Sequence, residues 1–198
     1  MRAFVAIDVP EAVKDALGRA QETLRATGAD LKPVGRDGMH LTLAFLGEVP
    51  DGVVERLGAC LDEAVRAFPF FAVPVREVGF FGSPGSPRVV WAGLQAAGTT
   101  LAGLQAAVGS AVQACAGPDW SWQPEARAFV PHLTLARVRS ARNAAALVAA
   151  CDKLKDRAFG DMPVERVTLF RSDLRPDGPH HSVVHVAALA ATKRVGPA

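Results

Sequence analysis

The five-residue string HLTLA occurs twice in this chain of 198 residues, and the two copies lie almost half the chain apart. Residues 39–44 read MHLTLA, and residues 131–136 read PHLTLA. A repeat at this separation indicates two halves of one fold, since the units of a solenoid are much shorter. The sequence therefore predicts a duplicated architecture.

Each copy is predicted to be a β-strand because it is apolar, contains Thr and is flanked by Gly or Pro. Side chains alternate between the two faces of a strand, so His40 and Thr42 share one face, and so do His132 and Thr134. If the halves are related by a pseudo-twofold axis, both pairs face one cleft. Opposed imidazoles can act as an acid and a base, and hydroxyls can stabilise an oxyanion.

Composition limits the class of protein. The hydrophobic content of 49% and the charged content of 21% are ordinary for a soluble globular chain of one core or two small lobes. A net charge of +2 excludes a strongly basic nucleic-acid wrapper but permits a local basic cleft. Without a secretory signal or a bilayer-spanning apolar run, we expect a cytoplasmic monomer that does not bind membranes.

Neither cysteine nor metal chemistry is expected. Cys60, Cys115 and Cys151 fall in predicted helices, which favours free thiols in a reducing cytoplasm over a nucleophile. A metal site needs three or more well-placed ligands, and no Cys or carboxylate pattern complements His180, His181 and His185. We therefore predict no metal and no cofactor, with these three histidines on the surface or at the rim of the cleft.

The order of the predicted elements favours an α+β (mixed α/β) fold over a doubly wound parallel sheet. We expect a single bilobal domain over residues 1–198, in which each lobe is a mostly antiparallel sheet with helices on its outer face. Residues 193–198 are expected to form a flexible tail. Strands are predicted at 2–8, 39–46, 70–81, 88–94, 128–138, 162–171 and 181–190, and helices at 10–26, 51–67, 98–115 and 141–155.

Five segments together resemble one known family, the 2H phosphoesterase superfamily, and especially its RNA 2′,3′-cyclic phosphodiesterase branch, first described as bacterial 2′-5′ RNA ligases. One H-x-T string would carry no information, but two inside H-L-T-L-A are specific. The segments that carry the resemblance are residues 2–10, 40–47, 88–94, 131–137 and 170–174.

The resemblance implies metal-independent hydrolysis of RNA 2′,3′-cyclic phosphate ends, such as those of tRNA fragments, to 2′-phosphates, with 2′-5′ ligation as a minor reverse reaction. It implies that His40 is the proton donor and His132 the proton acceptor, beside Thr42 and Thr134. Two alternatives stay open: a phosphodiesterase for another small nucleotide, such as 2′-5′ oligoadenylate or an ADP-ribose cyclic phosphate, and a non-catalytic nucleotide-binding module.

Two further residues are candidates for substrate binding. The resemblance implies that Arg137 contacts the phosphate, although strict alternation places it on the face opposite His132. The strand must therefore bulge or end there, or the side chain must reach around. The resemblance also implies that Phe81 stacks on a nucleobase, with core packing as the alternative. The chain departs from the family in having no Tyr, and no Trp stands at residues 32–34.

Overall fold

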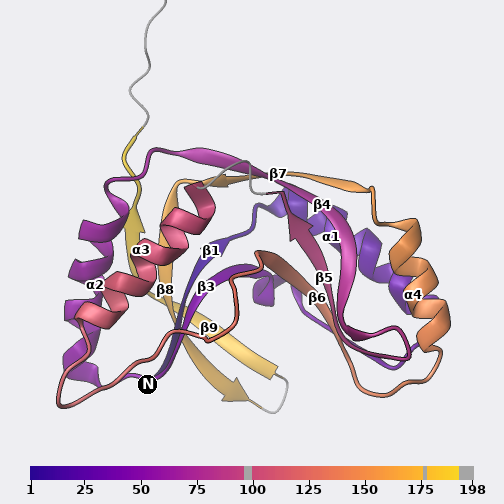
Figure 1. Cartoon of the computed structure of the whole chain (residues 1–198), viewed down its shortest axis with the longest axis horizontal. Coiled ribbons are helices and arrows are strands. Elements are labelled where there is room, and N and C mark those ends of the chain that lie inside the picture. The colour runs from indigo at the N-terminus through magenta and orange to yellow at the C-terminus, as the bar shows by residue number, and fades with distance from the viewer. Residues whose placement is uncertain (96–99, 176–177, 192–198) are drawn as a thin grey trace, which may run out of the picture.

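The structure of the protein is a computed structural model that describes residues 1–95, 100–175 and 178–191. Two antiparallel sheets form two lobes that lie side by side (Figure 1). The first sheet has the order β3-β1-β8-β9, with β1 at Arg2–Asp8, β3 at His40–Glu48, β8 at Arg166–Arg175 and β9 at Gly178–Ala188. The second has the order β2-β6-β5-β4-β7, with β2 at Leu31–Pro33, β4 at Phe71–Ser83, β5 at Ser86–Leu94, β6 at His132–Val138 and β7 at Ala158–Val164.

Two helices cover each sheet on its outer side (Figure 1). On the first sheet, α2 (Asp51–Val65) packs against β9 and β8, and α3 (Thr100–Ala114) packs against β3. On the second sheet, α1 (Glu11–Arg25) packs against β7 and β6, and α4 (Ala144–Lys153) packs against β4 and β5. Each helix buries an apolar stripe at intervals of three or four residues, as Val13, Leu17, Ala20 and Leu24 do in α1.

The two sheets repeat one arrangement, because β3, β1 and β8 are neighbours in the same way as β6, β5 and β4. The halves of the chain nevertheless interleave. Helix α1 lies in the connection from β1 to β3 of the first sheet, which also contains β2, yet it packs on the second sheet. Helix α3 connects β5 to β6 of the second sheet yet packs on the first. The predicted α+β fold with two antiparallel lobes is confirmed.

Several element boundaries differ from the sequence prediction. The strand expected at 162–171 is two strands, β7 and β8, and β7 begins at Ala158. It was not predicted because it contains Gly160, with φ of 110°, and Pro163, which a strand tolerates at the edge of a sheet. Strand β6 begins at His132, not at 128, and β2 and a 3₁₀ turn at Arg36–Gly38 were not predicted.

Two expectations concern residues outside the described ranges. They are the predicted tail at 193–198 and the first two residues of the helix expected at 98–115. No helix within the described ranges has the length and apolar character that crossing a membrane requires.

Candidate active site

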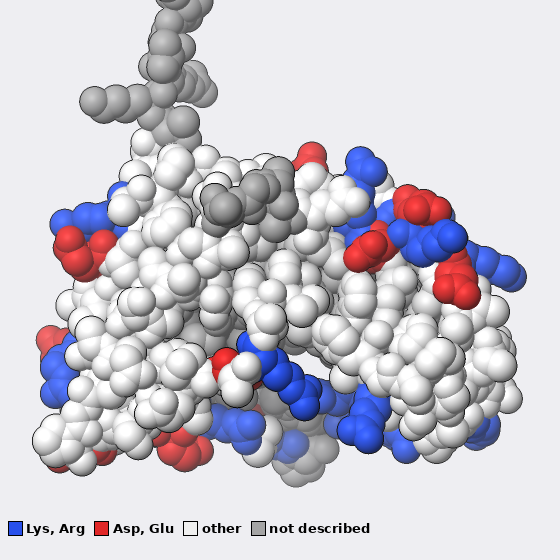
Figure 2. Space-filling view, viewed as in Figure 1, with Lys and Arg blue, Asp and Glu red and all other residues white. Residues whose placement is uncertain are grey.

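A cleft with a volume of about 1140 Å³ opens between the lobes, and Figure 2 shows it as a hollow with basic side chains around it. Strand β3 contributes His40 and Thr42 to its lining, and β6 contributes His132 and Thr134. The structure thus brings together the two pairs that the repeated strings suggested. The other two candidates, Arg137 and Phe81, line the same cleft.

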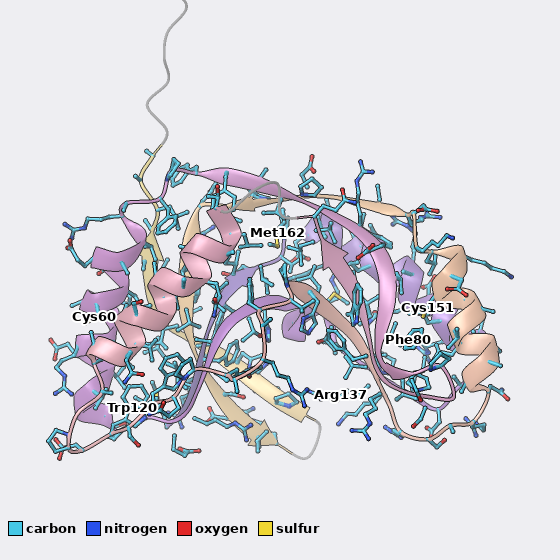
Figure 3. The ribbon with its side chains drawn as sticks, viewed as in Figure 1. Cys60, Phe80, Trp120, Arg137, Cys151 and Met162 are labelled. Atoms are coloured by element: carbon cyan, nitrogen blue, oxygen red, sulfur yellow. The ribbon has the colours of Figure 1, made fainter. Side chains whose placement is uncertain are left out.

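A β-bulge explains how Arg137 reaches the face that carries His132. Strand β5 pairs Trp91 with Thr134 and Val90 with Ala136, so Leu135 is an extra residue in β6. A bulge of this kind shifts the alternation by one residue, and every later side chain changes face. Figure 3 shows Arg137 at the opening between the lobes.

Strand β3, which carries the first copy of the repeated string, has the same bulge at the equivalent residue. Strand β1 pairs Ala6 with Thr42 and Val5 with Ala44, which leaves Leu43 as the extra residue of β3. Beyond the bulge, Phe45 lines the cleft. The repeat therefore extends from the sequence string to an irregularity of the backbone.

The His132 ring is oriented by a hydrogen bond and by an aromatic contact. Its Nδ1 lies 2.7 Å from the carbonyl oxygen of Val130. Because a carbonyl oxygen can only accept, Nδ1 carries the hydrogen, and Nε2 of the neutral ring holds the lone pair. The Phe81 ring stands perpendicular to the imidazole at 4.9 Å and lies 5.5 Å from the Trp91 ring, which backs it.

The His40 ring lies in an aromatic cluster on the cleft side of the first sheet. It stacks on Phe4 at 4.6 Å, with the Phe170 ring at 6.4 Å and the edge of His181 at 5.4 Å. Burial lowers the pKa of His40 to about 4, and the neighbouring His181 adds to this effect. The unliganded site therefore holds His40 as neutral imidazole at neutral pH.

Basic side chains concentrate on the wall that the second sheet provides. Lys32 of β2 is the ladder partner of Arg137 of β6, so the two lie side by side on the cleft face. Among the described residues, neither forms an ion pair, whereas Arg36, also in the lining, is held by two carboxylates of α1. Lys32 and Arg137 are thus available to an anionic ligand.

The remaining histidines separate into two locations. His180 and His181 line the cleft, whereas His185 lies beside α2, with its Nε2 3.0 Å from a carboxylate oxygen of Asp62. The even spacing of His181 and His185 would place them on one face of a regular strand, but β9 has an extra residue at Val184 that places them on opposite faces. Within the described parts of the chain, no group of three potential ligands could hold a metal ion.

The cysteines take no part in this site. Burial raises the pKa of the Cys115 thiol to about 12 and that of Cys151 to about 11, so neither is a thiolate at neutral pH. The Sγ atoms of Cys60 and Cys115 lie 2.8 Å apart, between α2 and α3, and none of the three thiols lines the cleft.

Three residues that line the cleft were not identified as functional candidates from the sequence: Phe45, Lys32 and His181. Phe45 could have been found by aligning the two repeats, because it stands where the second repeat has Arg137. The place of Lys32 depends on the unpredicted strand β2, and that of His181 depends on the register of β9, which no local pattern reports.

Comparisons with known proteins agree with this architecture. The family model described as LigT-like phosphoesterase matches residues 7–91 and 97–180. The RNA 2′,3′-cyclic phosphodiesterase of Methanothermobacter thermautotrophicus is 33% identical over 189 residues, which are 96% of this chain and 99% of that protein.

Solved structures show the same similarity. The protein TT0787 of Thermus thermophilus superposes with a TM-score of 0.77 at 32% identity, covering 97% of this chain and 100% of that one. E. coli LigT complexed with 3′-AMP gives a TM-score of 0.72 at 26% identity, covering 95% and 97%. The chain belongs to the LigT-like phosphoesterases, the 2H family that its two histidine strings resemble.

Proposed function

We propose that this phosphoesterase hydrolyses RNA 2′,3′-cyclic phosphate ends to 2′-phosphates by acid–base catalysis with two histidines and no metal. One observation carries the proposal: two strands with the same bulge bring His40, Thr42, His132 and Thr134 to a single cleft from two different sheets. Relatives that are RNA 2′,3′-cyclic phosphodiesterases, aligned over nearly the whole chain, support the choice of substrate.

In the proposed reaction, His132 Nε2 accepts a proton from water as the water oxygen attacks phosphorus. The bond from phosphorus to the 3′ oxygen breaks, and His40 donates its proton to that oxygen, which leaves the phosphate on the 2′ oxygen. The carbonyl of Val130 supports the role of His132, because it keeps the lone pair on Nε2 and stabilises the ring once it is protonated.

Because its pKa is low, His40 can act as the acid only after it has gained a proton. The imidazole is neutral in the free protein, so it must take up its proton together with the substrate, whose negative charge favours the imidazolium. Once charged, the imidazolium can donate its proton to the departing alkoxide, which is a far stronger base than imidazole. The same steps with a 5′-hydroxyl in place of water would break the bond from phosphorus to the 3′ oxygen and form a 2′-5′ phosphodiester, as a minor ligation.

The other cleft residues have matching roles in this proposal. The hydroxyls of Thr42 and Thr134 donate to non-bridging phosphate oxygens, and Arg137 neutralises the charge that develops on them. The Phe81 ring, which lines the cleft beside His132, stacks on a nucleobase of the bound RNA end. The 3′-AMP bound to E. coli LigT supports a site for a nucleotide phosphate.

The test is turnover of a short synthetic RNA that ends in a 2′,3′-cyclic phosphate. The reaction should proceed unchanged in EDTA, and phosphorus NMR should show the 2′-phosphate as the product. Loss of activity in EDTA with rescue by a divalent ion would refute the metal-free mechanism, and a 3′-phosphate product would refute the assigned leaving group. A protein that binds the RNA product but does not turn over the cyclic end would be a binding module.

A further inference from the structure

Strands β3 and β6, which carry the two copies of the repeated string, have different side chains at one equivalent position in the cleft. Two residues beyond the bulge, β6 carries Arg137 and β3 carries Phe45, and both side chains line the cleft. The guanidinium of Arg137 suits a phosphate, whereas a phenyl ring offers a flat apolar surface. The backbones of the two strands are thus equivalent at this position, but the two side chains differ in chemistry.

The Phe45 ring is open to the cleft although its neighbours in the strand are buried. Phe45 is 57% exposed, whereas Ala44 is 7% and Leu46 is 4% exposed. Single exposed apolar side chains are common on protein surfaces. This ring, however, lies 6.4 Å from the Phe4 ring, which in turn stacks on His40 at 4.6 Å. Phe45 is therefore one ring removed from a proposed catalytic imidazole.

The backbone that carries this ring is held firmly. Strand β3 is an edge strand, and its outer carbonyl groups would otherwise be unpaired. Trp122 Nε1 donates to the carbonyl oxygen of Phe45 at 2.7 Å, and Trp120 Nε1 donates to that of Glu48 at 2.9 Å. Trp120 lies at the outer end of the first lobe (Figure 3). A ring on a fixed backbone loses little entropy when a ligand stacks on it.

The charge of the cleft indicates which part of a nucleic acid faces this ring. The wall opposite Phe45 carries Arg137 and its ladder partner Lys32, which are suited to phosphates. The aromatic wall of the first sheet, with Phe4 and Phe170 behind Phe45, is suited to a base. Phe45 and Phe81 line the cleft from different sheets, so the cleft offers two separate aromatic rings to an RNA end.

We propose that Phe45 is a platform for a second nucleobase, that of the nucleotide immediately 5′ of the one whose base stacks on Phe81. This inference rests on the proposed function and narrows its substrate class to an RNA end of at least two nucleotides. Base–aromatic stacking contributes about 1–3 kcal/mol per base, which corresponds to a gain in affinity of roughly 5-fold to 150-fold.

Calorimetric binding of three product-like ligands tests the proposal without requiring turnover. The ligands are adenosine 2′-phosphate, the dinucleotide ApA with a terminal 2′-phosphate, and the same dinucleotide without its 5′ base. The unmodified protein should bind the full dinucleotide roughly 5-fold to 150-fold more tightly than the one without the 5′ base. Phe45→Leu should abolish this difference and leave the affinity for adenosine 2′-phosphate unchanged.

Two further variants serve as controls for the stacking of the 5′ base on Phe45. Phe70→Leu changes a partly exposed Phe (37%) outside the cleft and should alter none of the affinities. Phe81→Leu should weaken all three ligands by a similar factor. The inference is overturned if the 5′ base adds no affinity, if Phe45→Leu keeps the gain, or if that variant weakens adenosine 2′-phosphate equally. Because binding is the readout, a failure of catalysis would refute the proposed function and leave this result interpretable.

Discussion

Gln21 and Gln105 hold the two bulges of the active site in the same way, each from a helix that connects strands of the opposite sheet. Gln21 of α1 donates through Nε2 to the carbonyl oxygen of Leu135 at 2.8 Å, and Gln105 of α3 donates to that of Leu43 at 3.2 Å. A bulge disturbs the regular ladder, and each of these amides donates to the carbonyl of the extra residue. The duplication thus includes the supports of the site.

Gln21→Leu should therefore reduce both stability and activity. The substitution keeps the size of the side chain but removes hydrogen bonds to the carbonyls of Leu135 and Val34. The carbonyl of Leu135 keeps its second donor, the Val34 N–H at 2.9 Å, whereas the carbonyl of Val34 loses the Gln21 amide, and an unsatisfied acceptor of this kind costs about 1–3 kcal/mol, which urea denaturation would measure. Turnover should fall as well, because Arg137 follows the bulge by two residues. Gln113→Leu, at an exposed position of α3, is the control, and equal effects of both variants would contradict this role.

The fold class, and the location of four of the cleft residues, could be predicted from the sequence because both follow from patterns that the sequence displays. His40, Thr42, His132 and Thr134 keep strict alternation, and the repeated string marks them. The bulges are not visible in the pattern, so Arg137 was recognised through the family resemblance only, and its face was left open. Strand β7 was missed because its Gly and Pro are tolerated only at a sheet edge, and edge position is a property of the tertiary structure.

Arg137→Gln should raise KM for a cyclic phosphate end and lower kcat, because the side chain is proposed to neutralise charge that increases in the transition state. Arg137→Lys should recover part of the activity, since it restores the charge without the planar fork of donors. Steady-state kinetics would measure both effects. Arg139→Gln, which removes an exposed cation outside the cleft, is the matched control for net charge. A similar loss in both variants would point to long-range electrostatics.

The buried His40 should make the protein less stable as the pH falls below neutral. The pKa of His40 is about 4 in the folded chain and 6.5 as its ordinary value, so between these values only the unfolded chain binds the proton. Stability is therefore complete above pH 6.5 and is lost as the pH falls towards 4, by about 2 kcal/mol between pH 7 and pH 5. Urea denaturation of the protein and of His40→Asn at several pH values should show this difference, and parallel pH dependences would contradict it.

The final prediction concerns the division of roles between the two histidines. His40→Ala and His132→Ala should each lower kcat by roughly 10²–10⁴-fold, with circular dichroism unchanged. His185→Asn is the control, because His185 lies beside α2 and outside the cleft.

An acid is needed only when the leaving group is poor, whereas a base is needed to activate water for any ester. On a phosphodiester with a strongly acidic leaving alcohol, His40→Ala should recover much of its lost rate, and His132→Ala should remain slow. Rescue of His132→Ala instead would reverse the assignment, and the carbonyl of Val130 would then orient the acid. If neither variant is rescued, the acid–base division itself is wrong, and both imidazoles would act mainly by stabilising the charge of the phosphate.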